Sequence, residues 1–134
     1  MTDRDRQLLA LRPAVPTADP DAAGSDVEAF LHRTLRPVLK LQNDALLALV
    51  AHDVRKRVKG FDRFAPDDQR ERLVQTLQQD SRLKRVLLGV VLGALTADEL
   101  AFALQHEAEV RRRITMLLTE RVRSQAEAVA KRGS

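Results

Sequence analysis

The feature that most constrains this chain is a segment, Arg82 to Leu95, that is apolar on almost every side when wound as a helix. After Arg85 it carries no charge, and its apolar residues are Leu83, Val86, Leu87, Leu88, Val90, Val91, Leu92 and Leu95. A helix of this kind is buried on most sides. The segment therefore predicts a central helix in a helical core, with a strand as the alternative because valines are consecutive.

Capping and period signals predict further helices on both sides of this segment. Thr96 and Glu99 have the spacing of a capping box. The expected helices run from Ser25 to about Leu35, from Pro37 to Lys59 with Gly60 as the terminator, from Pro66 to about Asp80, and from Ala97 to about Ala130, the last one broken near His106 or continuous. The sequence thus predicts an all-α fold, a compact bundle of five to six helices.

The first part of the chain has a different composition. Residues 1–24 contain Pro13, Pro16 and Pro20, which prevent a continuous helix, so we expect a flexible tail before one helical domain over residues 25–130. The tail holds a compact apolar cluster, Leu8, Leu9 and Leu11. It is either a helical turn that folds back on the domain or a docking peptide for a partner.

Composition excludes several classes. The 134 residues contain no cysteine, so disulfides, thiolate metal sites and a cysteine nucleophile are absent. The start does not resemble a signal peptide, and the longest uncharged run, Val86 to Ala97, is shorter than the roughly 20 residues of a membrane span. We expect a cytoplasmic protein without membrane contact, and the preference for Arg over Lys suggests a bacterial source.

Two glycines four residues apart, Gly89 and Gly93, stand in the central helix. Each costs about 1 kcal/mol of helix propensity relative to alanine, so each needs a reason. Tight packing of a neighbouring helix is the first interpretation. A symmetric dimer contact and room for a ligand are the alternatives.

Two basic clusters are the candidates for contact with an acidic partner. They consist of Arg55, Lys56, Arg57 and Lys59, and of Arg111, Arg112 and Arg113. Consecutive helical residues fan around the axis, and acids stand four residues before several of them, which favours intramolecular ion pairs. An acidic protein surface or a nucleic acid is the alternative partner, although no aromatic residues are interleaved to stack bases.

Residues for catalysis or metal binding are not arranged in a known pattern. His106 and Glu109 have a ligand-like spacing, but a di-iron motif would need Glu where Ala103 stands. We find no nucleophile elbow and no phosphate-cradling loop. The sequence predicts no enzyme, no metal and no cofactor.

These observations together predict a helical protein-interaction module. It would be an adaptor, an assembly factor or a small regulator, and a homodimer, since a small domain covers an all-round apolar helix more easily with a second subunit. The alternatives are a nucleic-acid-associated protein that uses the basic clusters and a small-molecule-sensing domain with a pocket beside the glycine pair.

Overall fold

The computed structural model describes residues 1–15 and 25–132, and these residues form helices and no strand. The all-α class is therefore confirmed. The strand alternative for the apolar segment is wrong, because its residues 82–92 lie in a helix, Ser81–Leu92, and residues 93–95 lie in the turn that follows. None of the described helices combines the length and the apolar character that a bilayer crossing requires.

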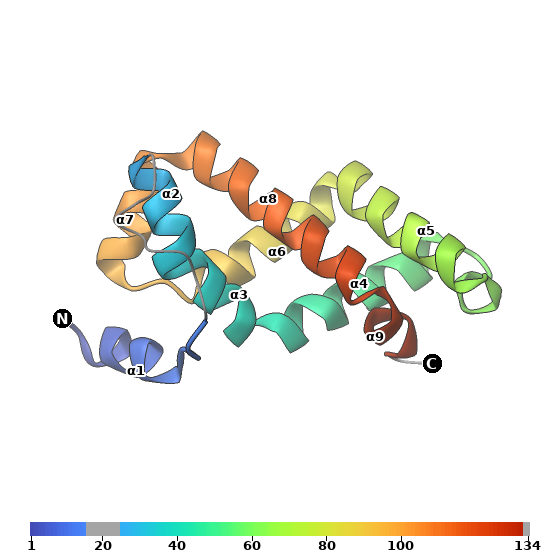
Figure 1. Ribbon diagram of the computed structural model, residues 1–134, viewed down its shortest axis with the longest axis horizontal. Helices are drawn as coiled ribbons and strands as arrows, with labels where there is room; N and C mark the ends of the chain where they lie inside the picture. The colour runs from blue at the N-terminus through green and yellow to red at the C-terminus, as the bar shows by residue number, and fades with distance from the viewer. Residues whose placement is uncertain (16–24, 133–134) are drawn as a thin grey trace. The chain divides into compact units, whose positions relative to one another are not determined.

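The helices from the second onward are joined by short connections (Figure 1). In chain order the described helices are α1 (Asp3–Leu11), α2 (Asp26–Phe30), α3 (Arg36–Leu41), α4 (Asn43–Arg57), α5 (Pro66–Gln79), α6 (Ser81–Leu92), α7 (Ala97–Gln105), α8 (Glu107–Ser124) and α9 (Ala126–Lys131). A π turn, Leu31–Leu35, joins α2 to α3 without a break, and a 3₁₀ turn, Phe61–Arg63, follows α4. With α2 and α3 counted as one helix, the described residues hold eight. The expected count of five to six is wrong.

Besides α1, which lies in the predicted tail, three helix boundaries occur where a single residue leaves helical backbone. Gln42 has φ −90° and ψ 5°, His106 has φ −115° and ψ 38°, and Gln125 has φ −114° and ψ 24°. The break at His106 is one of the two alternatives that the sequence leaves open. Apolar residues keep helical spacing across Gln42 and Gln125, so hydrophobic period does not reveal these two breaks.

The sequence predicts a new helix at Pro37, and the structure instead continues helically through this residue. Arg36 lies in right-handed helical backbone, at φ −62° and ψ −48°, directly after the π turn. Pro37 has no N–H to donate to the preceding turn. A widened turn at this point accommodates the missing hydrogen bond without ending the helix.

Gly60 terminates α4 as expected, since it adopts left-handed backbone at φ +74°. This conformation favours glycine because other residues place their Cβ too close to the following carbonyl. The turn then leads to Phe61, whose ring is buried.

The chain divides into two compact units. Unit 1 comprises Met1–Asn43 with Leu88–Ile114, and unit 2 comprises Asp44–Leu87 with Thr115–Ser134. The sequence predicts one domain over 25–130 preceded by a flexible tail over 1–24, and this division stays a prediction. Within that tail, residues 3–11 form a helix that belongs to unit 1, while residues 16–24 lie outside the described residues.

Each unit has an aliphatic core, as the low aromatic content implies. The fully buried side chains of unit 1 include Leu35, Val38, Val91, Leu95 and Ile114. Those of unit 2 include Leu46, Val50, Val54, Leu73 and Leu77, and α5 contacts α9 in this unit.

Candidate functional site

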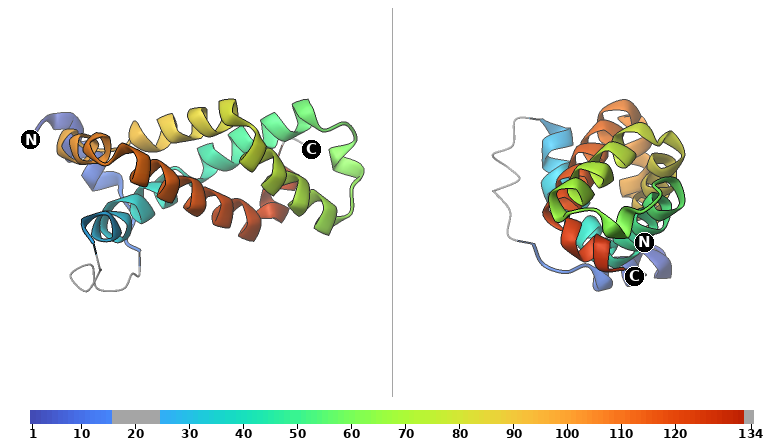
Figure 2. Two further views of the ribbon diagram at one scale, coloured as in Figure 1. Left: turned by 90° about the horizontal axis from the view of Figure 1, so that it is seen from above. Right: turned by 90° about the vertical axis from the view of Figure 1, so that its right-hand side faces the viewer.

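Helix α1 lies beside the turn between α6 and α7, in unit 1 (Figures 1 and 2). The helix starts at Thr2, whose hydroxyl accepts from the Asp5 N–H at 3.1 Å. The guanidinium of Arg4 donates to the carbonyl oxygens of Gly93, at 2.7 Å, and Leu95, at 3.0 Å. Carbonyls that follow a helix carry partial negative charge and lack helical partners, so a cation is favourable there.

Asp5 contacts the same turn at its α7 end. Its carboxylate is buried and accepts a hydrogen bond from the N–H of Ala97, at 3.1 Å, in the first position of α7. This N–H has no partner within its own helix, and a helix N-terminus favours an anion. The two neighbouring charges of α1 thus match the two helix ends that meet at the turn.

The third contact is an ion pair between Arg12 and Glu99. The guanidinium donates to both carboxylate oxygens, at 2.6 and 2.5 Å, and also to the carbonyl of Ala94 at 3.1 Å. The side chains are only 9% and 18% exposed. Burial raises the pKa of Glu99, but the hydrogen bonds from Arg12 and from the Thr96 N–H outweigh it and bring that pKa below its ordinary value.

Glu99 also completes the capping box that the sequence predicts. The Thr96 hydroxyl accepts from the Glu99 N–H at 3.3 Å, and the Glu99 carboxylate accepts from the Thr96 N–H at 2.8 Å. One carboxylate therefore starts α7 and anchors the N-terminal segment. We name the turn of residues 93–99, with its carbonyls, N–H group and Glu99 carboxylate, the α6–α7 corner.

The apolar cluster of α1 is largely directed to solvent. Leu8 is half-buried, Leu9 is 40% exposed and Leu11 is 62% exposed. Asp5, a charged residue, is the buried residue of this helix. The structure therefore holds α1 by charged groups and leaves two of its three leucines uncovered.

The glycine pair does not meet a neighbouring helix at Gly89. A Cβ built on Gly89 has no heavy atom within 4 Å other than its own helix backbone and chain neighbours, so the interpretation as tight helix packing is wrong for this residue in the described part of the chain. A Cβ on Gly93 would lie 3.0 Å from the Gly89 carbonyl. Gly93 instead contributes its carbonyl to Arg4 of α1.

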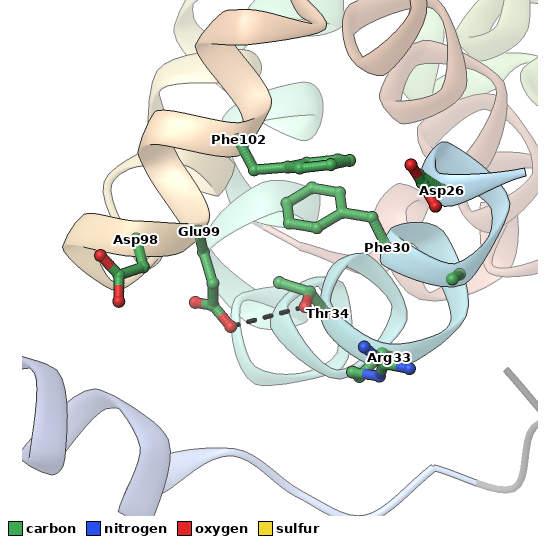
Figure 3. A pocket seen from close by; sticks show the side chains of 8 residues that line it. Asp26, Phe30, Arg33, Thr34, Asp98, Glu99 and Phe102 are labelled. Carbon is green, nitrogen blue, oxygen red and sulfur yellow. Dashed lines mark hydrogen bonds between the residues drawn. The ribbon is translucent and has the colours of Figure 1, made fainter. Parts of the chain in front are cut away.

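A hollow of about 370 Å³ lies on unit 1 between α7 and the helical segment from α2 to the π turn (Figure 3). We call it the aromatic cleft. The rings of Phe30 and Phe102 stack at 4.7 Å, and the Thr34 hydroxyl donates to Glu99 at 3.4 Å. The cleft is lined by Asp26, Ala29, Phe30, Arg33, Thr34, Asp98, Glu99 and Phe102.

The first basic cluster belongs to unit 2 and is partly engaged within it. Arg55 donates to the Asp62 carboxylate at 2.9 Å and to the backbone carbonyls of Ala130 and Arg132 at the end of α9. Lys56 and Lys59 are exposed.

Arg57, the remaining member of this cluster, binds two carboxylates. Its Nε lies 2.8 Å from Asp80 Oδ2 and 3.3 Å from Asp53 Oδ2. Burial, followed by the hydrogen bond to Asp80, raises the pKa of Asp53. The same hydrogen bond from Asp53 lowers the pKa of Asp80, which also caps α6 through the Leu83 N–H at 3.0 Å. Asp53 therefore retains its proton to a higher pH than an isolated aspartate would.

The second basic cluster belongs to unit 1. Arg111 pairs with Glu107 at 2.9 Å, as its spacing predicts, and Arg113 pairs with Glu28 of α2 at 2.7 Å. Arg112 is exposed. Intramolecular pairing thus engages two of the three arginines of this cluster, as it engages both arginines of the first.

Sequence reasoning does not find the residues that anchor α1. No contact is expected from the sequence for Arg4, Asp5 or Arg12. Their partners lie 82 to 92 residues away along the chain, beyond the reach of spacing rules. Among the described residues, no three His, Asp or Glu side chains gather as metal ligands.

No protein-family model, characterised protein or solved structure matches this chain.

Proposed function

We propose that this chain is a non-enzymatic helical protein-interaction module, an adaptor, assembly factor or small regulator that self-associates through α1. One observation carries the proposal. Charged side chains at both ends of α1 fasten it to the α6–α7 corner, while Leu9 and Leu11 face solvent.

An isolated helix of nine residues is marginal in water, so α1 depends on its anchors. A helix that folded back only to complete a core would bury its leucines, because apolar burial stabilises by about 25 cal/mol per Å². Here Asp5 is buried and two leucines are not. Anchoring fixes the leucine pair before a partner arrives, which reduces the ordering cost of association.

Several finer expectations belong to the same proposal. A compact bundle, a homodimer, a cytoplasmic location and a bacterial source stay predictions from the sequence. So does the absence of catalysis, metal and cofactor.

Sedimentation velocity over a dilution series tests the proposal with a double variant, Leu9→Gln with Leu11→Gln. The matched control is Leu104→Gln, which changes a leucine of α7 that is 56% exposed. We expect the wild type and the control to dimerise alike and the double variant to dimerise at least about tenfold more weakly. An unchanged double variant, or a wild type that is monomeric throughout, would contradict the proposal.

The aromatic cleft supports a second candidate, a small-molecule-sensing domain. Its stacked Phe30 and Phe102 rings offer an apolar floor, and Asp26 and Asp98 place carboxylates on its walls. This combination suits an organic amine. An arylalkylamine should raise the melting temperature more than its neutral alcohol analogue, and equal effects would count against the candidate.

The nucleic-acid alternative keeps less support. Four of the seven arginines and lysines in the basic clusters are engaged in ion pairs with carboxylates of the same chain. Binding that falls steeply with salt would revive it.

A further inference from the structure

We propose that the α6–α7 corner binds α1 of a second copy, so that two chains exchange residues 2–12 and form a closed two-fold dimer. This inference rests on the proposed self-association and names the surface through which it occurs. The corner is then the docking site, and the N-terminal segment of the other chain is its occupant.

The corner recognises its occupant by a three-part charge pattern. It offers three backbone carbonyls and the Glu99 carboxylate as acceptors, and one backbone N–H as a donor. The segment supplies the complement, with Arg4 and Arg12 as donors and the Asp5 carboxylate as an acceptor. Every one of these contacts is equally available to the same segment of another copy.

Little apolar burial ties α1 to its own corner. Asp5 is its buried residue, Leu8 is half-buried, and Leu9 and Leu11 are exposed. Release of α1 therefore breaks polar contacts that a second copy restores one for one. Exchange of an identical element is a low-cost route to a dimer because it uses again the contacts that the single chain already makes at the corner.

The length of chain between the segment and the rest of unit 1 also permits exchange. Residues 13–24 are twelve residues, which reach at most about 40 Å when extended. Docking within one chain is favoured at low concentration because the linked segment has a high effective concentration. Burial of Leu9 and Leu11 between two copies is the additional contribution that favours the exchanged form.

A charge-reversal experiment tests the exchange. Arg12→Glu and Glu99→Arg each place like charges together, both within their own chain and in their own homodimer. When the two variants are mixed, the exchanged heterodimer alone has opposite charges at both corners. The segment that carries Arg12→Glu meets the corner that carries Glu99→Arg, and the two unchanged residues meet at the other corner. We expect each variant to lose homodimer affinity by about 100-fold and the mixture to recover a heterodimer, seen by native mass spectrometry.

The double variant Arg12→Glu with Glu99→Arg in one chain is the control for folding. It restores complementary charge within the chain and should recover the thermal stability that the single variants lose. A mixture that yields no heterodimer, although both variants have native helix content by circular dichroism, overturns the proposal.

A second measurement detects the exchange by a covalent link between chains instead of by affinity. The chain has no cysteine, which makes introduced thiols unique. Chains with Arg12→Cys and chains with Glu99→Cys are mixed and treated with a short bis-maleimide, each end of which adds to one thiol. Because each chain holds one thiol, a 12–99 link forms only between chains, and its dominance over 12–12 and 99–99 products is the expected result.

The outcomes separate the two proposals. If the wild type dimerises but no 12–99 link forms between chains, exchange is wrong and self-association through α1 stands. If the wild type is monomeric at every concentration, both are wrong.

Discussion

Arg12 and Glu99, 87 residues apart in the sequence, form a two-pronged ion pair with nitrogen–oxygen distances of 2.6 and 2.5 Å. Both side chains are largely buried. If one were removed, water could not solvate the charge of the other as well as the ion pair does. This pair joins the N-terminal segment to the start of α7 in unit 1.

Replacement of Arg12 by Met should destabilise the protein by about 3 kcal/mol, because it leaves the Glu99 charge partly buried without its partner. Urea denaturation measures the loss. The control is Arg6→Met, which removes an exposed pair with Asp3 and should change the free energy of unfolding by less than about 1 kcal/mol. Equal effects of the two variants would show that the Arg12 contact carries no special weight.

The same pair predicts a dependence on pH. Its hydrogen bonds hold the pKa of Glu99 below the ordinary value of 4.5, so the carboxylate is favoured in the folded state. The stabilisation is therefore present above that ordinary value and is lost as pH falls through the lower folded pKa. The stability difference between the wild type and Arg12→Met should shrink in that acid range, as measured by urea denaturation at stepped pH.

The pKa shift of Asp53 is opposite in direction to that of Glu99. Burial, together with the hydrogen bond to Asp80, raises its pKa, so the folded state favours the protonated form and loses stability as pH rises through the folded pKa. Asp53→Asn mimics the protonated form and should stabilise the protein at neutral pH, by no more than about 1 kcal/mol because the side chain is partly solvated. The gain should vanish near about pH 3, where an aspartate is already largely protonated.

Thermal unfolding at the two pH values measures this effect. Asp44→Asn is the control, because it changes an exposed aspartate of the same helix that pairs with Arg132. A gain that persists unchanged at low pH would refute the explanation by a raised pKa of Asp53.

Alanine substitutions at Gly89 and Gly60 should change the stability of the protein in opposite directions, because the two glycines differ in backbone conformation. Gly89 is helical with open space around its Cβ position, so Gly89→Ala should stabilise the protein by about 1 kcal/mol. Gly60 has φ +74°, so Gly60→Ala should destabilise it by about 1 kcal/mol. Melting temperatures of the two variants should move in opposite directions, and a loss in Gly89→Ala would point to a contact on that face.

Local signals predict local structure well in this chain. The capping box at Thr96 and Glu99 and the left-handed turn at Gly60 are as expected, because each depends on residues within one helical turn. The helix breaks at Gln42 and Gln125 are different, because no proline or glycine marks these positions.

The candidate site is predictable only in part. The sequence draws attention to Leu9 and Leu11, but not to Arg4, Asp5 and Arg12, which position them. Charged residues are most often exposed to solvent, so the sequence does not mark these three as contacts. A partner more than 80 residues away also produces no recognisable spacing in the sequence. The glycine pair is the opposite case. Its spacing is a recognisable packing pattern, but there is open space around the Cβ position of Gly89.

Methyl NMR of selectively labelled leucines tests the central claim most directly, namely that α1 presents Leu9 and Leu11 to a second copy. Spectra are recorded over a concentration series, with Leu104 as the exposed reference. We predict that the Leu9 and Leu11 methyl resonances shift with a common dissociation constant while those of Leu104 stay in place. Unchanged Leu9 and Leu11 resonances across a series in which the protein dimerises would contradict the account.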